Sequence, residues 1–302
     1  MISEFLLFRL NLVDRQDLFE RPIKDDSELI RVVERASNER FDVSKQGRRR
    51  GYKWALRSPT TGSIGEAATF IDVTFSRELA SHRGPIITSD GITQGTSTLN
   101  PPTATLVRIL IDLRRHVFAI EDVPSIIQTH SGWKTNLQTI LSSAAWDLEF
   151  TSMFRLDPIL PKRMVENRLQ TFERVTRLRV TLSIPNPDLG PTFQHLYEEM
   201  ARGGIRELAQ DMRNERGLNV GPETLPRAAI DMAMGGYRKG KIHFYGLSGG
   251  QKQEFTVEDD VSRIQVEEVR GFVEGYVAAR PSPEVKRLAG AIIQKIDDLL
   301  GE

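Results

Sequence analysis

The feature that most constrains the fold is a strict alternation of apolar and polar side chains in the run VTRLRVTLSI. Leu178, Val180, Leu182 and Ile184 alternate with Arg177, Arg179, Thr181 and Ser183. A period of two residues is the mark of a β-strand with one buried face and one polar face. Such strands are typical of antiparallel sheets, which keep one face in water. The segment from Glu4 to Val13 shows the same alternation, with Leu6, Phe8, Leu10 and Leu12 on one side.

Helical patterns lie between the predicted strands. The apolar spacing predicts helices after Asp25, from Trp133 to Trp146, and from Thr192 to Arg216 with an interruption at Gly203-Gly204. A last helix follows Pro281-Ser282-Pro283, and its apolar stripe is Val285, Leu288, Ile292, Ile296 and Leu299. Regular β-α-β alternation is missing. We therefore predict an α+β fold with a largely antiparallel mixed sheet, flanking helices and a C-terminal amphipathic helix.

A stretch dense in Gly, Ser, Thr and Pro suggests a division of the chain. It covers residues 81–104, and loops of this length without secondary structure are uncommon in compact domains. We predict an N-terminal β-rich region (1–80) that contains a basic segment, a loop or linker (81–104), and an α+β region (105–302) that ends in the helix. A long functional excursion between two sheet segments is favoured over a linker.

Composition excludes several classes of function. The 302 residues contain 41 Lys+Arg and 41 Asp+Glu, so the chain has no strongly basic character overall. The absence of Cys excludes thiol catalysis, zinc ribbons, iron–sulfur clusters and disulfides, and favours a cytoplasmic protein. The N-terminus, MISEFLLFRLNLVDRQ, does not resemble a signal peptide, and no apolar run is long enough to cross a membrane. We expect no cofactor and no membrane partner.

Two glycine-rich strings imitate nucleotide-binding motifs. LSGGQ, at residues 247–251, matches the signature of ABC-type ATPases, and GGYRKGK, at residues 235–241, has phosphate-loop spacing. A phosphate loop places Ser or Thr after its Lys and leads into a helix. Here Ile242 follows Lys241, and the pattern of the next residues is that of a strand. We interpret Gly249-Gly250 as the turn of a hairpin.

No catalytic or metal-binding residue can be named from spacing. Ser248 fits the G-x-S-x-G pattern, but the last histidine, His243, precedes it, which excludes an α/β-hydrolase order. Glu284-Val285-Lys286, with Asp259 and Asp260 upstream, has the form of a nuclease motif but opens a helix. The five histidines are scattered. An unrecognised metal-dependent nuclease stays open as an alternative because carboxylate ligands can converge from distant positions.

A basic segment with aromatic residues is the strongest functional signal. Between Lys45 and Arg57 the basic residues are Lys45, Arg48, Arg49, Arg50, Lys53 and Arg57, with Tyr52 and Trp54 among them and no acid. Basic side chains neutralise phosphates, and aromatic rings stack on unpaired bases. This combination predicts a nucleic-acid-binding segment. The competing interpretation is a charged edge strand, with Trp54 in the core.

Arginines on the polar faces of other strands suggest an extension of this surface. Arg9, Arg177 and Arg179 would form one basic face if their strands share a sheet, and Arg114 and Arg115 at a hairpin turn would enlarge it. The same surface could dock an acidic protein.

A resemblance adds a biological setting. The run HVFAIE, a helix, VTRLRVTLSIPNPD and the strand and turn KIHFYGLSGG resemble uncharacterised prokaryotic proteins encoded with phage-defence genes. The similarity covers about residues 105–260 and lies outside the basic segment. It implies a cytoplasmic bacterial accessory or sensor protein and assigns no catalytic residue.

Our leading hypothesis is a cytoplasmic protein that binds DNA or RNA through residues 45–57 together with Arg177 and Arg179, within a bacterial anti-phage defence system. The alternative is an interaction subunit of a homo-oligomer or complex without nucleic-acid affinity. In that case the C-terminal helix, with Ile293 and Leu300 widening its apolar face, would contact a partner.

Overall fold

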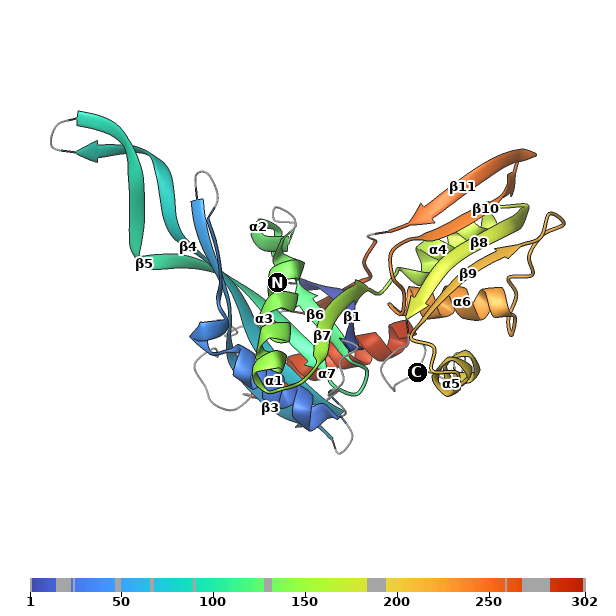
Figure 1. Cartoon of the computed structure of the whole chain (residues 1–302), viewed down its shortest axis with the longest axis horizontal. Coiled ribbons are helices and arrows are strands. Elements are labelled where there is room, and N and C mark those ends of the chain that lie inside the picture. Colours follow the sequence, from blue (N-terminus) through green and yellow to red (C-terminus); the bar gives the residue numbers. More distant parts are fainter. Residues whose placement is uncertain are drawn as a thin grey trace.

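The computed structural model describes most of the chain (Figure 1). The described residues are 2–14, 23, 25–46, 50–65, 68–88, 91–127, 132–183, 194–258, 260–267 and 283–300. Their fold is α+β with antiparallel sheets and a C-terminal helix, as predicted.

The larger of the two described sheets has eight strands and is antiparallel. Its order is β12 (Arg263–Glu267), β1 (Ile2–Asp14), β6 (Val117–Glu121), β5 (Gly91–Asp112), β4 (Ala68–Thr88), β3 (Arg50–Ile64) and β2 (Val43–Gln46). Strand β7 (Ser152–Pro158) also pairs with β1, along the half of β1 that follows Leu7. The expected tight connection at Arg114-Arg115 joins β5 to β6.

Helices cover both faces of this sheet. On one face α1 (Asp26–Ala36) and α3 (Trp133–Asp147) bury their apolar stripes against residues such as Phe8, Phe75 and Ile109. The short elements η1 (Glu39–Phe41) and α2 (Pro124–Ile127) accompany them. Asp25 caps α1 by accepting a hydrogen bond from the Glu28 N–H, as the sequence indicates.

The C-terminal helix α7 (Pro283–Leu300) packs on the opposite face. Its predicted stripe is buried with Phe5, Leu7 and Phe70 of the sheet. Ile293, which would widen the apolar face for a partner under the alternative hypothesis, is only 7% exposed, and Leu300 packs against the same core. The chain's own core therefore uses this face.

A second, four-stranded antiparallel sheet lies beside the first (Figure 1). Its order is β11 (Gln251–Val257), β10 (Ile242–Ser248), β8 (Arg174–Ser183) and β9 (Glu207–Arg213). Helices α4 (Lys162–Gln170) and α6 (Leu225–Met234) pack on the face that carries Leu178, Val180 and Leu182. The expected hairpin turn between β10 and β11 has positive φ at both Gly249 and Gly250 (57° and 74°).

Two predicted elements were wrong. Residues 81–104 were expected as a loop or linker, but 81–88 belong to β4 and 91–104 to β5. The two strands pair from Phe70↔Asp112 out to Thr88↔Gly91 and form an arm that extends from the body (Figure 1). Small polar residues suggested a loop, but the ladder needs only backbone groups. Of the helix predicted from Thr192, only α5 (Gln194–Arg202) is helical among the described residues, because ELAQDMR adds β9 to the edge of β8.

Candidate nucleic-acid interface

Trp54 of the basic segment belongs to the core. Its side chain is 3% exposed and stacks on Phe75 with ring centroids 5.3 Å apart. The guanidinium of Arg77 lies over both Trp54 and the half-buried Tyr52, 5.9 Å and 5.0 Å from the two ring centroids. Burial leaves Trp54 unable to stack on a base, so its role is the structural one that the sequence left open.

Two of the three cations of this segment whose side chains are described pair with carboxylates. Arg57 donates to both oxygens of Asp42, at 2.8 and 2.6 Å, and Lys53 lies 3.2 Å from Glu78. Lys45 is exposed on β2. Arg48 and Arg49 lie outside the described residues, as does the side chain of Arg50. Among the described side chains of the segment, Lys45 is the one charged residue classed as exposed.

The predicted basic face that joins Arg9 to Arg177 and Arg179 does not exist. Arg9 belongs to the large sheet and the other two to the small one. Arg9 is 4% exposed and donates to the backbone oxygens of Gly235 and Arg115. Arg115 is also buried and pairs with Asp112 and Asp297. These arginines satisfy internal acceptors, which is the usual condition for a buried charge.

Arg177 and Arg179 instead lie on the polar face of the four-stranded sheet, opposite α4 and α6. The strand register aligns side chains in two rows across that face. One row is Thr256, His243, Arg179 and Asp211, and the next is Glu254, Tyr245, Arg177 and Arg213. Directly opposed residues in antiparallel strands have neighbouring side chains. The fold thus gathers two aromatic rings and three arginines from three strands.

Asp211 organises the arginines. It accepts hydrogen bonds from Arg177 (2.7 Å to each oxygen) and from Arg213 (3.1 and 2.7 Å), and Arg179 Nε lies 3.9 Å away. These hydrogen bonds, from Arg177 first, lower the pKa of Asp211 far below its ordinary value. The group carries one negative charge for three positive ones. Arg179 and Arg213 remain 51% and 63% exposed.

A hollow of about 320 Å³ opens beside this group. Arg179, Lys239, Lys241 and His243 contribute to its lining, together with Asp211. Glu207 pairs with Lys239 (2.7 Å), and Glu258 pairs with Lys241 (2.5 Å). Ion pairs between such exposed groups are weak, so a phosphate can compete for the two lysines.

The aromatic rings lie next to the hollow. His243 and Tyr245 are parallel within 13°, with centroids 6.3 Å apart, and Arg177 lies 5.2 Å from the Tyr245 centroid. Glu254 accepts from His243 Nδ1 at 3.1 Å, and this contact lowers the pKa of Glu254. Neither ring was among the site residues predicted from the sequence. The alternation in KIHFYG could have placed them on one face, but not beside Arg177 and Arg179.

Other classes of site gain little support. Within the described residues, no group of three or more His, Asp or Glu side chains could hold a metal ion. None of the described helices is long and apolar enough to cross a membrane. The specific PNPD string of the resemblance lies outside the described residues.

Comparison with known proteins connects the chain to one family. A family model described as a domain of unknown function, DUF4747, matches residues 96–269, more than half of the chain. The chain belongs to this family. The DUF4747 match includes β8, β9, β10 and β11, and therefore all of the polar sheet face described above. No curated protein and no solved structure matches the chain.

Proposed function

We propose that this DUF4747 protein binds nucleic acid on the polar face of its four-stranded sheet, through phosphate contacts and stacking on accessible bases. The observation that carries the proposal is the hollow lined by Arg179, Lys239, Lys241 and His243, with Tyr245 beside it. Cationic grooves flanked by aromatic rings suit single strands, whose bases present their faces for stacking.

The carboxylates that now pair with these cations are few and exposed, so phosphates can replace them. Each lysine of the hollow is held by one exposed glutamate, and the three arginines share one aspartate. A phosphate chain supplies several negative charges in series and releases its own counterions when cations replace them.

The test is fluorescence anisotropy with short single-stranded DNA and RNA at low salt. Arg179→Ala combined with Arg213→Ala is expected to weaken binding about tenfold or more, and Tyr245→Ala roughly tenfold. The matched control is Lys162→Ala with Arg163→Ala, which removes two positive charges from exposed positions of α4 on the covered side of the same sheet. Equal affinities of the two double variants would contradict the assignment.

Arg48, Arg49 and Arg50, with Lys45, stay a second predicted contact; of these, Lys45 and the backbone of Arg50 belong to the large sheet. Replacing the three arginines by Ala in the same assay tests them separately. The narrower role, an accessory or sensor protein of anti-phage defence in the bacterial cytoplasm, rests on the resemblance of residues 105–260. It predicts that a strain carrying the gene loses phage resistance when Arg179 and Arg213 are both replaced.

A further inference from the structure

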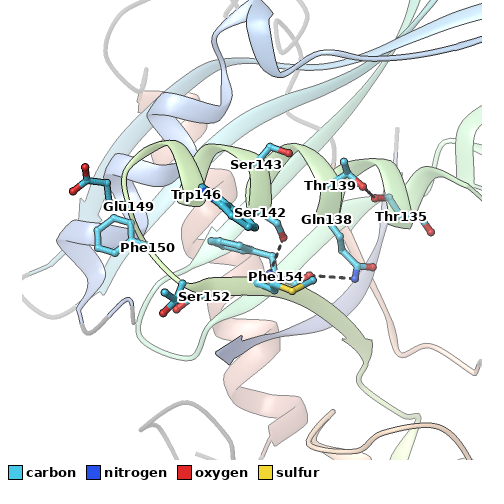
Figure 2. Close-up of a pocket in the computed structure, with 12 residues that line it drawn as sticks. Thr135, Gln138, Thr139, Ser142, Ser143, Trp146, Glu149, Phe150, Ser152 and Phe154 are labelled. Atoms are coloured by element: carbon cyan, nitrogen blue, oxygen red, sulfur yellow. Dashed lines mark hydrogen bonds between the residues drawn. The ribbon is translucent and has the colours of Figure 1, made fainter. Parts of the chain in front are cut away.

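A groove between helix α3 and strand β7 forms a second candidate site, on the large sheet (Figure 2). It has a volume of about 560 Å³, within the range of pockets that hold small molecules. One wall carries hydroxyl and amide groups of α3, from Thr135, Gln138, Thr139, Ser142 and Ser143. Trp146, also on α3, and Met153 of β7 add exposed indole and thioether surface, and the nearly buried Phe150 and Phe154 complete the apolar part of the lining.

Large apolar side chains are exposed at this groove. Trp146 is 64% exposed and Met153 is 40% exposed, although α3 and β7 otherwise bury their apolar residues. Val13, 38% exposed, is the cross-strand neighbour of Met153 in β1 and continues the apolar surface. Burying a Trp side chain is strongly favourable, and contiguous exposed apolar surface often marks a binding site.

The edge of β7 is already closed at the centre of the groove. The Phe154 N–H donates to Ser142 Oγ at 2.9 Å, and Gln138 Nε2 donates to the Phe154 carbonyl oxygen at 3.2 Å (Figure 2). An added β-strand would need both backbone groups of Phe154, and α3 occupies them. A ligand in this groove is therefore recognised by side chains and not by strand addition.

Charge restricts the ligand further. No Lys, Arg or His stands among the described residues that line the groove, and Glu149 is the single charged group. Glu149 would repel a phosphate or carboxylate placed here, and none of the described lining residues supplies a counter-charge for it. The groove suits a molecule without negative charge.

From these observations we propose that the α3–β7 groove binds a small uncharged molecule with a flat ring and hydrogen-bonding groups on its rim, the chemistry of a nucleoside or free nucleobase. The ring stacks on Trp146 and contacts Met153. The hydroxyls of Thr135 and Ser143 meet the rim groups, together with the hydrogen-bonding capacity that Ser142, Gln138 and Thr139 keep beside their internal bonds to Phe154 and to the Thr135 carbonyl oxygen. This inference does not depend on the function proposed for the four-stranded sheet.

Acrylamide quenching of tryptophan fluorescence tests it in the full chain. Trp54 and Trp133 are buried, at 3% and 6% exposure, so the accessible signal comes from Trp146. Adenosine, guanosine, cytidine, uridine and their free bases serve as probes. At least one should shield Trp146 with a Kd on the order of 100 μM. The matching 5′-monophosphate should shield it less than the nucleoside.

Variants assign the effect to the groove. By calorimetry, Trp146→Ala should weaken binding about tenfold, and Trp146→Phe should retain most of it, because a flat ring remains. Leu225→Ala, which removes a 52% exposed apolar side chain from α6, is the matched control and should bind normally. The proposal is overturned if no probe shields Trp146, if Trp146→Ala binds as well as the parent, or if raising the protein concentration alone shields Trp146, which would identify a self-contact.

Discussion

Arg9 of β1 donates from its Nε to the carbonyl oxygen of Gly235 over 2.9 Å, which joins the large sheet to the end of helix α6 beneath the small one. The same guanidinium donates to the Arg115 carbonyl and lies 4.6 Å from the Tyr237 ring centroid. Two positions along β1, Asn11 Nδ2 donates to the Gly236 carbonyl at 2.9 Å and to Asp157 at 2.6 Å. Buried polar contacts thus fix the relative position of the two sheets.

Replacing Arg9 by Met should destabilise the protein by about 3 kcal/mol, because two buried carbonyl groups lose a charged donor. Urea unfolding followed by circular dichroism measures the change. Arg179→Met removes an exposed arginine and should stay within about 0.5 kcal/mol of the parent. Equal stabilities of the two variants would show that the Arg9 contacts between the two sheets contribute nothing to the stability of the protein.

Gly236 should be far less tolerant of Ala than Gly240. Both have positive φ, 88° and 76°, so a Cβ costs roughly 1–2 kcal/mol at either position. At Gly236 the new Cβ would also lie 2.5 Å from Arg9 Cβ, whereas nothing lies within 4 Å at Gly240. Gly236→Ala should therefore unfold at least about 1 kcal/mol more easily than Gly240→Ala. The same loss at both positions in thermal or urea unfolding would show that the backbone at Gly236 does not pack closely against Arg9.

Asp211→Asn should strengthen nucleic-acid binding. The substitution removes the negative charge that Arg177 and Arg213 now bind, so both become available to phosphates. We expect a Kd roughly three- to fivefold lower at low salt, the scale of an exposed ion pair. Glu34→Gln makes the same charge change at an exposed position of α1 and should leave the Kd unchanged. Weaker binding by Asp211→Asn would mean that its positioning of the arginines outweighs its charge.

The unfolding free energy should depend on pH through the titration of Asp112. Burial raises the pKa of its carboxyl above 3.8, against the opposing effect of Arg115. As pH rises from 3.8, the unfolded chain loses this proton first. The unfolding free energy contributed by Asp112 therefore falls with pH until the folded pKa is passed, and is constant above it.

Asp112→Asn removes this titration. The difference in unfolding free energy between parent and variant should decrease from pH 3.8 upward and then level off, as measured by urea unfolding at a series of pH values. A difference that increases over that window would mean that Arg115 dominates and that the folded protein favours the ionised carboxyl.

Local patterns predicted the elements whose own residues determine them. The alternation from Arg177 to Ser183, the cap at Asp25 and the turn at Gly249-Gly250 are each set within a few residues, and the structure has all three. The arm at 81–104 was not predictable in this way, since its small polar residues look like a loop and backbone pairing between β4 and β5 makes it a ribbon.

The candidate interface depended on register between distant strands. Arg177 and Arg179 were found from their own strand. Their neighbours Tyr245 and His243 come more than sixty residues later, and only the β8–β10 pairing brings them together. The opposite error occurred at Arg9, where a polar position in an alternating strand was assumed to face solvent but satisfies buried carbonyls instead.

The central claim is that the polar face of the four-stranded sheet contacts phosphates. The most direct test is the salt dependence of single-strand binding, measured by anisotropy for the parent and for Arg179→Ala with Arg213→Ala. Each phosphate contact adds about 0.7 to the magnitude of the slope of log K against log salt concentration. The parent should show a steep slope, and the double variant a slope shallower by about 1 to 1.5. Identical slopes, or no binding by the parent at low salt, would contradict the account.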